Sequence, residues 1–181
     1  GDLVLGQFRG YRSEAGVAPV SQVPTYAALR LHVDSWRWAG VPFFIRAGKK
    51  LCATATEVRV DLRATPQRIF ADAARDGANY LRFRLGPEVQ VALGARAKRA
   101  GDGMHGEETE LFVLRQSPED LLPYDRLIGD AMEGDPTLFA REDTVEAAWR
   151  IVDPVLRMPT PVHAYEPGSW GPAEARELGE T

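Results

Sequence analysis

Apolar and polar residues alternate through most of the first two thirds of the chain. Leu81, Phe83 and Leu85, for example, alternate with Arg82 and Arg84, which places successive side chains on opposite faces of an extended backbone. This period of two is typical of half-buried β-strands. The pattern, with a Gly-Pro turn between its last two members, predicts strands at residues 29–33, 58–62, 81–85 and 89–93.

Two short runs are apolar at nearly every position, and we expect both to be buried strands. They are residues 41–45 and residues 111–114. Because the second run has no polar face, it predicts a central strand, covered on both sides.

The hydrophobic period changes to that of a helix in the final third. Ser117, followed by a proline and two acidic residues, is a typical N-cap, and we expect a helix from there to about Gly134. Asp143 predicts the cap of a second helix, which Pro154 should bend or end. The second helix carries an apolar stripe at positions 145, 148, 149, 152 and 156.

Strands followed by helices, without strict alternation of the two, indicate an α+β fold. We expect a large, mainly antiparallel sheet, with helices packed on it mostly from the C-terminal third. No internal repeat and no linker divides the sequence, so a single domain over residues 1–181 is predicted.

The composition narrows the class of protein. Lys and Arg total 22 and Asp and Glu total 26, a net charge of −4 that argues against nucleic acid as the main partner. A content of 44% hydrophobic and 27% charged residues excludes an acidic disordered chain. The longest apolar stretch, residues 39–45, is too short to span a membrane, and no secretory signal is visible. The single cysteine, Cys52, cannot form an internal disulfide, which fits a reducing compartment.

A basic cluster follows the apolar run at residues 41–45. Arg46, Lys49 and Lys50 surround Gly48. Glycine allows a close approach of the backbone to a ligand, and lysine supplies a point charge for phosphate or sugar oxygens. The alternative is a solvated strand end, because basic clusters are common on protein surfaces. Spacing alone leaves both interpretations open.

Other patterns give no site by themselves. Residues 101–106 match G-x-G-x-x-G, but a strand is predicted after them rather than a helix, so we expect a hairpin loop and not a dinucleotide site. His32 and Asp34 share one strand face without a nucleophile beside them, and we interpret them as exposed polar residues.

The histidines and Cys52 lack metal-ligand spacing, and no metal site is expected. Aromatic residues between 36 and 44 fit a stacking platform, a core or a subunit interface.

Residues 34–49 read Asp-Ser-Trp-Arg-Trp-Ala-Gly-Val-Pro-Phe-Phe-Ile-Arg-Ala-Gly-Lys and closely resemble a signature of the glucose-6-phosphate dehydrogenase family. Further matching segments follow the order of that family and extend the resemblance over residues 6–178. They are residues 6–11, 124–130, 134–139, 141–149 and 165–172. The resemblance is to the C-terminal domain and implies its β+α fold.

In that family an N-terminal nucleotide-binding domain carries NADP, and the enzyme oxidises C1 of glucose 6-phosphate to the lactone, a step of the pentose phosphate pathway. The resemblance implies that a hydride goes to the nicotinamide while a histidine, oriented by a carboxylate, takes the hydroxyl proton. This sequence shows no counterpart of the dinucleotide-binding unit, the substrate motif or the catalytic histidine. We therefore expect the nucleotide-binding domain to be absent, with no catalytic residue and no NADP in this chain, which alone should be inactive.

One substrate contact carries over. Lys49 matches the lysine of the Gly-Lys pair of the family, which binds the substrate, glucose 6-phosphate. The resemblance also implies a homodimer paired through the sheet, the missing N-terminal domain as a partner, and a cytoplasmic location. Neither nucleic acid nor a membrane is expected as a partner.

The sequence also departs from the family. Thr54 stands where a second cation is usual, and Gly86 where a Gln or Asp near the substrate is usual, so sugar-phosphate binding should weaken by about 1–3 kcal/mol for each lost charged contact. Arg84 matches a basic position of a structural NADP site present in some lineages, but Gly94 replaces an expected lysine, and we do not predict that site. These departures motivate an alternative, a stand-alone, non-catalytic binding or assembly module that retains the fold.

Overall fold

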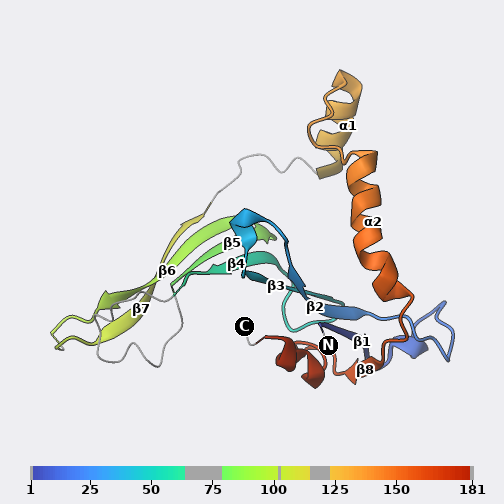
Figure 1. Cartoon of the computed structure of the whole chain (residues 1–181), viewed down its shortest axis with the longest axis horizontal. Helices are drawn as coiled ribbons and strands as arrows, with labels where there is room; N and C mark the ends of the chain where they lie inside the picture. Colours follow the sequence, from blue (N-terminus) through green and yellow to red (C-terminus); the bar gives the residue numbers. More distant parts are fainter. Residues whose placement is uncertain (1, 64–78, 102, 115–122, 180–181) are drawn as a thin grey trace. The chain divides into compact units, whose positions relative to one another are not determined.

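The computed structural model describes residues 2–63, 79–101, 103–114 and 123–179. Its elements, in chain order, are β1 (Leu3–Phe8), η1 (Tyr11–Ser13), β2 (Tyr26–His32), η2 (Trp36–Trp38), β3 (Pro42–Gly48), β4 (Thr56–Asp61), β5 (Tyr80–Gly86), β6 (Gln90–Lys98), β7 (Gly106–Leu114), α1 (Pro123–Glu133), α2 (Glu142–Leu156), β8 (Val162–Tyr165) and η3 (Ala173–Leu178). Among the described elements, seven strands precede the two α-helices and β8 follows them, and every strand pair but one is antiparallel, so the predicted α+β class is confirmed (Figure 1).

The chain forms two compact units. The first consists of Gly1–Ala53 and Asp130–Thr181, and the second of Thr54–Gly129. Each contains one four-stranded sheet of the described strands.

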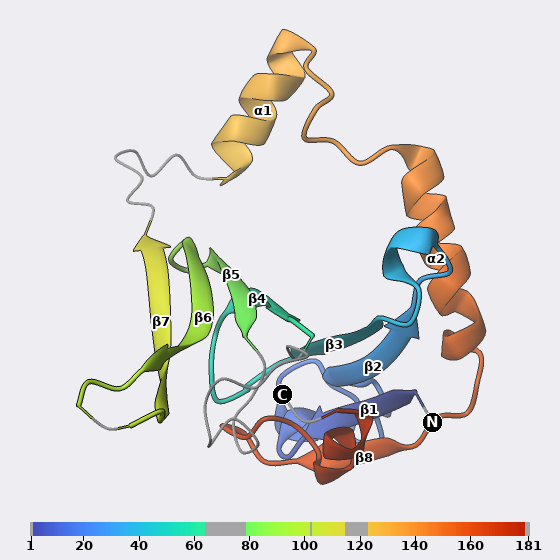
Figure 2. The same cartoon turned by 60° about the vertical axis from the view of Figure 1, so that its left-hand side comes forward.

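The sheet of the first unit has the strand order β3-β2-β1-β8. β1 and β8 form the one parallel pair among the described strands, in which Leu5 lies opposite Val162, and this pairing places the first described strand beside the last. Figure 2 shows η3, in dark red, beside the blue strand β1 and the red strand β8.

An aromatic cluster forms the core of this unit. Tyr165 on β8 is only 3% exposed, and its ring centre lies 5.5 Å from that of Tyr26 on β2 and 6.4 Å from that of Phe8 on β1. Ala175 and Leu178 of η3 complete the cluster. Burial of these rings anchors the C-terminal segment to the first strand of the sequence.

The second unit contains the fully antiparallel sheet β4-β5-β6-β7. β5 and β6 form the predicted hairpin around residues 86–88, and β6 and β7 form another in which Lys98 pairs with Gly106. The predicted strands at residues 58–62, 81–85 and 89–93 are therefore confirmed to within a few residues.

The prediction that residues 111–114 form a central strand is wrong. They belong to β7, which lies at an edge of the sheet formed by the described strands. Leu111 and Val113 are 67% and 72% exposed. They extend two cross-strand rows, Val60–Leu81–Leu93–Leu111 and Val58–Phe83–Val91–Val113, that we call the apolar face of the β4–β7 sheet. The apolar residues of β7 on this face are therefore not covered by other described residues.

The helices agree with the sequence in part. α1 ends at Glu133, and Gly134 follows with a φ of 72°, as predicted, whereas the cap expected at Ser117 lies outside the described residues. The cap of α2 is not Asp143 but Arg141, and the Asp143 carboxylate instead accepts hydrogen bonds from the Arg141 guanidinium. Pro154 lies in the last turn of α2, which ends at Leu156.

None of the described helices is both long and apolar enough to cross a bilayer.

The apolar stripe of α2 is exposed rather than packed. Trp149 is 54% exposed and Leu156 66%, and no residue of α2 is buried. The expected packing of this helix on a sheet is therefore not seen among the described residues.

Candidate functional site

The candidate site is built at the end of β3, where residues 48–50 form what we call the lysine turn. Gly48 pairs with Tyr26 of β2, and a Cβ atom at Gly48 would lie 2.8 Å from Cδ2 of the Tyr26 ring. Any larger residue would therefore displace a core tyrosine. The glycine in the basic cluster permits a close approach, as predicted, but the approach is to the core rather than to a ligand.

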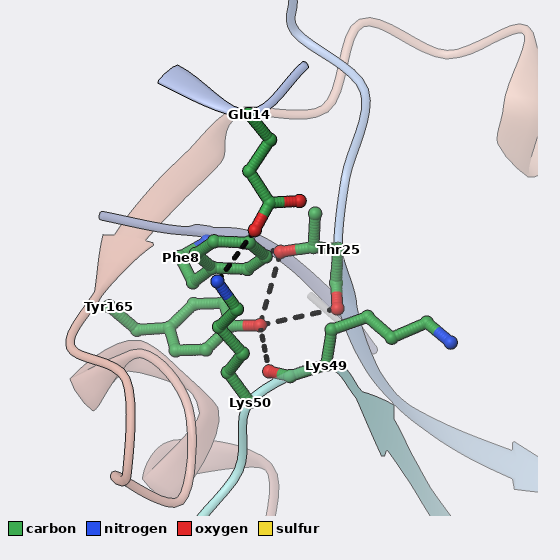
Figure 3. Close-up of polar contacts among 6 residues, drawn as sticks. All are labelled: Phe8, Glu14, Thr25, Lys49, Lys50 and Tyr165. Atoms are coloured by element: carbon green, nitrogen blue, oxygen red, sulfur yellow. Dashed lines mark hydrogen bonds and ion pairs between the residues drawn. The ribbon is translucent and has the colours of Figure 1, made fainter. Parts of the chain in front are cut away.

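Both polar groups of the Lys49 backbone are held by residues distant in sequence. Its N–H donates to the Thr25 carbonyl oxygen at 2.9 Å. Its carbonyl oxygen accepts from the Tyr165 hydroxyl at 2.7 Å (Figure 3). Because neither group can rotate freely, the direction in which the Lys49 side chain leaves the turn is fixed.

The side chain of Lys50 is engaged within the same unit. Its ammonium lies 2.6 Å from the Glu14 carboxylate and 4.3 Å from the centre of the Phe8 ring. The Lys50 backbone adopts a φ of 51°, in the left-handed region, and its carbonyl oxygen accepts from the Gly168 N–H at 2.8 Å. An ion pair, a cation–π contact and a hydrogen bond thus keep this lysine turned toward the core.

The three cations of the basic cluster diverge in the structure. The Arg46 guanidinium lies 5.5 Å from the centre of the Trp170 ring, and Lys50 faces Glu14. The Lys49 ammonium extends away from Lys50 into solvent and has no ion-pair or hydrogen-bond partner among the described residues (Figure 3). An exposed ammonium on an ordered backbone is suited to bind a phosphate or carboxylate as a point charge.

The positions that depart from the family lie in the second unit. Thr54 is exposed in the loop before β4, and Gly86 ends β5. Neither side chain carries a charge. Arg84 lies 3.5 Å from the Glu57 carboxylate and so has an acidic partner.

The structure explains why a glycine, rather than the lysine expected from the family, stands at position 94. Gly94 lies opposite Tyr80, and a Cβ atom at Gly94 would be 2.2 Å from Cε1 of that ring. The ring is held from both sides, because its hydroxyl donates to Glu110 at 2.9 Å and the Arg59 guanidinium lies 4.0 Å from its centre. The tyrosine therefore fills the space that a lysine at position 94 would require.

Other sequence candidates are placed as follows. His32 and Asp34 are exposed and share no hydrogen bond. The glycine motif of residues 101–106 lies in the turn between β6 and β7, as expected, although residue 102 is not among the described residues. Trp38 packs edge-on against Phe43 at 5.2 Å. The described residues include no cluster of His, Cys, Asp or Glu that could hold a metal ion, and Cys52 is exposed.

Sequence reasoning missed the residues that shape the turn. Thr25 and Tyr165 were not singled out, although position 165 opens one of the family-like segments. The signal could not be found locally, because 116 residues separate Tyr165 from Lys49.

Comparison with known proteins identifies related sequences. The family described as "Glucose-6-phosphate dehydrogenase, C-terminal domain" matches residues 2–181. Glucose-6-phosphate 1-dehydrogenase 1 of Mycobacterium tuberculosis is 42% identical over 178 residues, and the match covers 97% of this chain and 38% of that protein. Glucose-6-phosphate 1-dehydrogenase of Aggregatibacter actinomycetemcomitans is 38% identical over 193 residues. This chain thus spans about two fifths of the length of these relatives, 38% and 39%.

Solved structures share the fold. Glucose-6-phosphate 1-dehydrogenase from Mycobacterium avium superposes with a TM-score of 0.88 at 43% identity. The match covers 99% of this chain and 38% of the Mycobacterium avium chain. A glucose-6-phosphate dehydrogenase in complex with its substrate, glucose 6-phosphate, gives a TM-score of 0.82 at 29% identity, over 98% of this chain and 40% of that one.

Proposed function

We propose that this chain, which belongs to the glucose-6-phosphate dehydrogenase C-terminal domain family, is the substrate-binding and dimerisation domain of an NADP-dependent glucose-6-phosphate dehydrogenase. The enzyme would oxidise glucose 6-phosphate to 6-phosphogluconolactone. The observation that carries the proposal is the lysine turn, where the Lys49 ammonium is exposed and has no partner among the described residues while its neighbour Lys50 is bound to Glu14.

Lys49 would bind the phosphate group of the sugar. A phosphate carries about two negative charges at neutral pH, and a hydrogen bond to a charged group contributes roughly 1.5–3 kcal/mol. The contact would be equally strong before and during the reaction, because the phosphate is remote from C1. Lys49 should therefore lower KM and leave kcat largely unchanged.

The glycine-rich motif does not fit a dinucleotide site. A pyrophosphate site needs a glycine turn between a strand and a helix N-terminus. The glycine motif of residues 101–106 instead joins two antiparallel strands, β6 and β7. We therefore derive no hydride or proton step within this chain, and propose that NADP and the proton-abstracting histidine belong to a nucleotide-binding domain.

A turnover assay tests this division of roles. The purified chain, mixed with glucose 6-phosphate and NADP⁺, should form no NADPH. The enzyme that joins this domain to a nucleotide-binding domain should form NADPH with glucose 6-phosphate. Sustained NADPH formation by the 181 residues alone would contradict the proposal.

We propose that the domain also forms a homodimer, through the apolar face of the β4–β7 sheet. Its side chains from β4, β6 and β7, among them Val58, Val91, Leu93 and Val113, are 39–72% exposed. Contiguous apolar surface of this kind is typical of protein interfaces. A second copy of the chain would cover it.

The alternative, a stand-alone binding or assembly module, rests on the uncharged positions Thr54 and Gly86. Such a module would dimerise but would not bind the sugar phosphate. A thermal-shift titration separates the two functions, because a ligand that binds only the folded state raises Tm. A rise with glucose 6-phosphate that requires Lys49 supports the dehydrogenase domain, and the absence of any rise supports the module.

A further inference from the structure

The hydroxyl of Tyr165 is the last donor of a directed hydrogen-bond chain. It lies 2.7 Å from the Lys49 carbonyl oxygen, 3.1 Å from the Thr25 Oγ1 and 3.2 Å from the Thr25 carbonyl oxygen. A carbonyl can only accept, so the single hydroxyl proton of Tyr165 goes to the nearer one, that of Lys49. The Thr25 Oγ1 accepts from the Phe8 N–H at 3.0 Å, which leaves its own proton for Tyr165.

This chain runs from Phe8 through Thr25 and Tyr165 to Lys49, and every proton in it has an assigned acceptor. The hydrogen-bond chain is anchored in the core, because Phe8 and Tyr165 belong to the aromatic cluster and are only 4% and 3% exposed. The lysine turn therefore takes its position from the core of the unit rather than from its own flexible side chains.

The orientation of the Lys49 side chain depends on this arrangement. The Lys49 N–H is bound to the Thr25 carbonyl oxygen, and its C=O to Tyr165. The Tyr165 bond thus holds the peptide plane that joins Lys49 to Lys50, the residue in the left-handed region. If this plane rotated, Lys50 would leave Glu14, and the two ammonium groups would no longer diverge.

We infer that Tyr165 is a positioning residue, whose hydroxyl orients the Lys49 ammonium toward the phosphate of the sugar substrate. The inference rests on the proposed function, in which Lys49 binds that phosphate. Tyr165 itself is buried and would not touch the substrate. Its contribution is to hold the backbone from which the Lys49 side chain leaves the turn, so that less backbone freedom is lost on binding.

Steady-state kinetics of the full-length enzyme that contains this domain test the inference. Tyr165→Phe removes only the hydroxyl and should raise KM for glucose 6-phosphate about three- to tenfold, with a smaller change in kcat. Lys49→Ala should raise KM further, about 10- to 100-fold. In the Lys49→Ala background, Tyr165→Phe should add no more than about a twofold change, because the group it positions has gone.

A matched control is available in the same cluster. The Tyr11 ring packs against Phe8 at 5.4 Å between centres, and its hydroxyl makes no hydrogen bond among the described residues, so Tyr11→Phe should leave KM unchanged. A merely structural role for the Tyr165 hydroxyl would lower the folded fraction, and with it the apparent kcat, without moving KM. KM does not depend on the amount of folded enzyme, so the test holds even if the variant folds poorly.

The outcomes separate the inference from the function on which it rests. If Lys49→Ala leaves KM unchanged, the proposed function of Lys49 is wrong. If Lys49→Ala raises KM but Tyr165→Phe does not, or if the two effects multiply in the double variant, the positioning role is wrong. Thr25→Val, which removes the preceding donor in the chain, should raise KM in the same direction as Tyr165→Phe, and an unchanged KM would count against the hydrogen-bond chain.

Discussion

The Tyr165 hydroxyl donates a 2.7 Å hydrogen bond to the carbonyl oxygen of Lys49, across 116 residues of sequence. This bond joins two segments that each resemble the glucose-6-phosphate dehydrogenase family, the Gly-Lys pair at the end of β3 and the Tyr-Glu-Pro-Gly segment that begins at the last residue of β8. The candidate substrate lysine is thus tied directly to the aromatic core. Several measurable consequences arise from this and from the packing of the second unit.

The left-handed backbone at Lys50 predicts an unusual order of stability among variants. Lys50→Ala and Lys50→Gly both lose the contacts to Glu14 and Phe8, which are partly exposed and contribute at most about 1 kcal/mol each. Only glycine relieves the cost of a φ of 51°. We therefore expect Lys50→Gly to be more stable than Lys50→Ala by about 1 kcal/mol in urea unfolding. Equal stabilities, or a more stable alanine variant, would contradict this account of the turn.

The contact between Gly94 and Tyr80 predicts energetic coupling. Gly94→Ala places a Cβ within 2.2 Å of the tyrosine ring, which must move and strain its bond to Glu110. The cost should be about 1–3 kcal/mol, as for other overpacked sites. In a Tyr80→Ala background the same substitution should cost almost nothing. Additive effects in this double-mutant cycle, measured by urea unfolding, would show that the ring does not impose the glycine.

The Tyr80 hydroxyl predicts a loss of stability at alkaline pH. Its hydrogen bond to the Glu110 carboxylate, with a contribution from burial, raises the pKa of Tyr80 above its ordinary value near 10.0. The unfolded chain therefore releases this proton first, and the free energy of unfolding falls as the pH rises through about 10. Tyr80→Phe should remove this part of the fall. A parallel decline of wild type and variant in urea unfolding between neutral and alkaline pH would contradict the assignment.

The apolar face of the β4–β7 sheet predicts the surface through which two copies pair. Val113→Glu places a charge on this face and should convert the dimer to a monomer in sedimentation equilibrium, with little change in Tm because the side chain is 72% exposed. Phe112→Glu is the control, because the Phe112 side chain is adjacent in sequence, 55% exposed, and on the opposite face of β7. A monomeric wild type, or equal effects of both substitutions, would place the dimer interface elsewhere.

Much of the fold was accessible from the sequence where the hydrophobic pattern is local. The alternation in β4, β5 and β6 placed these strands, and the glycine after α1 placed the end of that helix. β1 and β8 were missed. β8 has four residues and gains its partner only through parallel pairing with β1, so its formation depends on contacts that no short window contains.

Two errors have physical causes. The apolar run in β7 was interpreted as central, because a strand that is apolar on both faces is usually covered on both. Among the described strands it lies instead at an edge of the sheet, and Leu111 and Val113 are exposed. Asp143 was assigned as a helix cap from its residue type, but α2 begins at Glu142, and Asp143 binds the Arg141 guanidinium instead. Both outcomes depend on neighbours that the local pattern does not specify.

The candidate site was predicted only in part. The family-like Gly-Lys segment indicated Lys49, whereas spacing alone could not distinguish it from Arg46 and Lys50. The distinction comes from the fold, which places Lys50 against Glu14 and Arg46 against Trp170. The hydrogen-bond chain that holds the turn needs Phe8, Thr25 and Tyr165 together, and these converge only in the folded sheet.

The central claim is that Lys49, and not its neighbour, binds the phosphate of glucose 6-phosphate. The most direct test is an NMR titration of the 181-residue chain with glucose 6-phosphate, with glucose as the ligand that lacks the phosphate. The account predicts saturable amide shifts around residues 48–50 with glucose 6-phosphate only, which Lys49→Met abolishes and Lys50→Met preserves. An absence of shifts in the wild-type chain, or shifts that survive Lys49→Met and vanish in Lys50→Met, would contradict it.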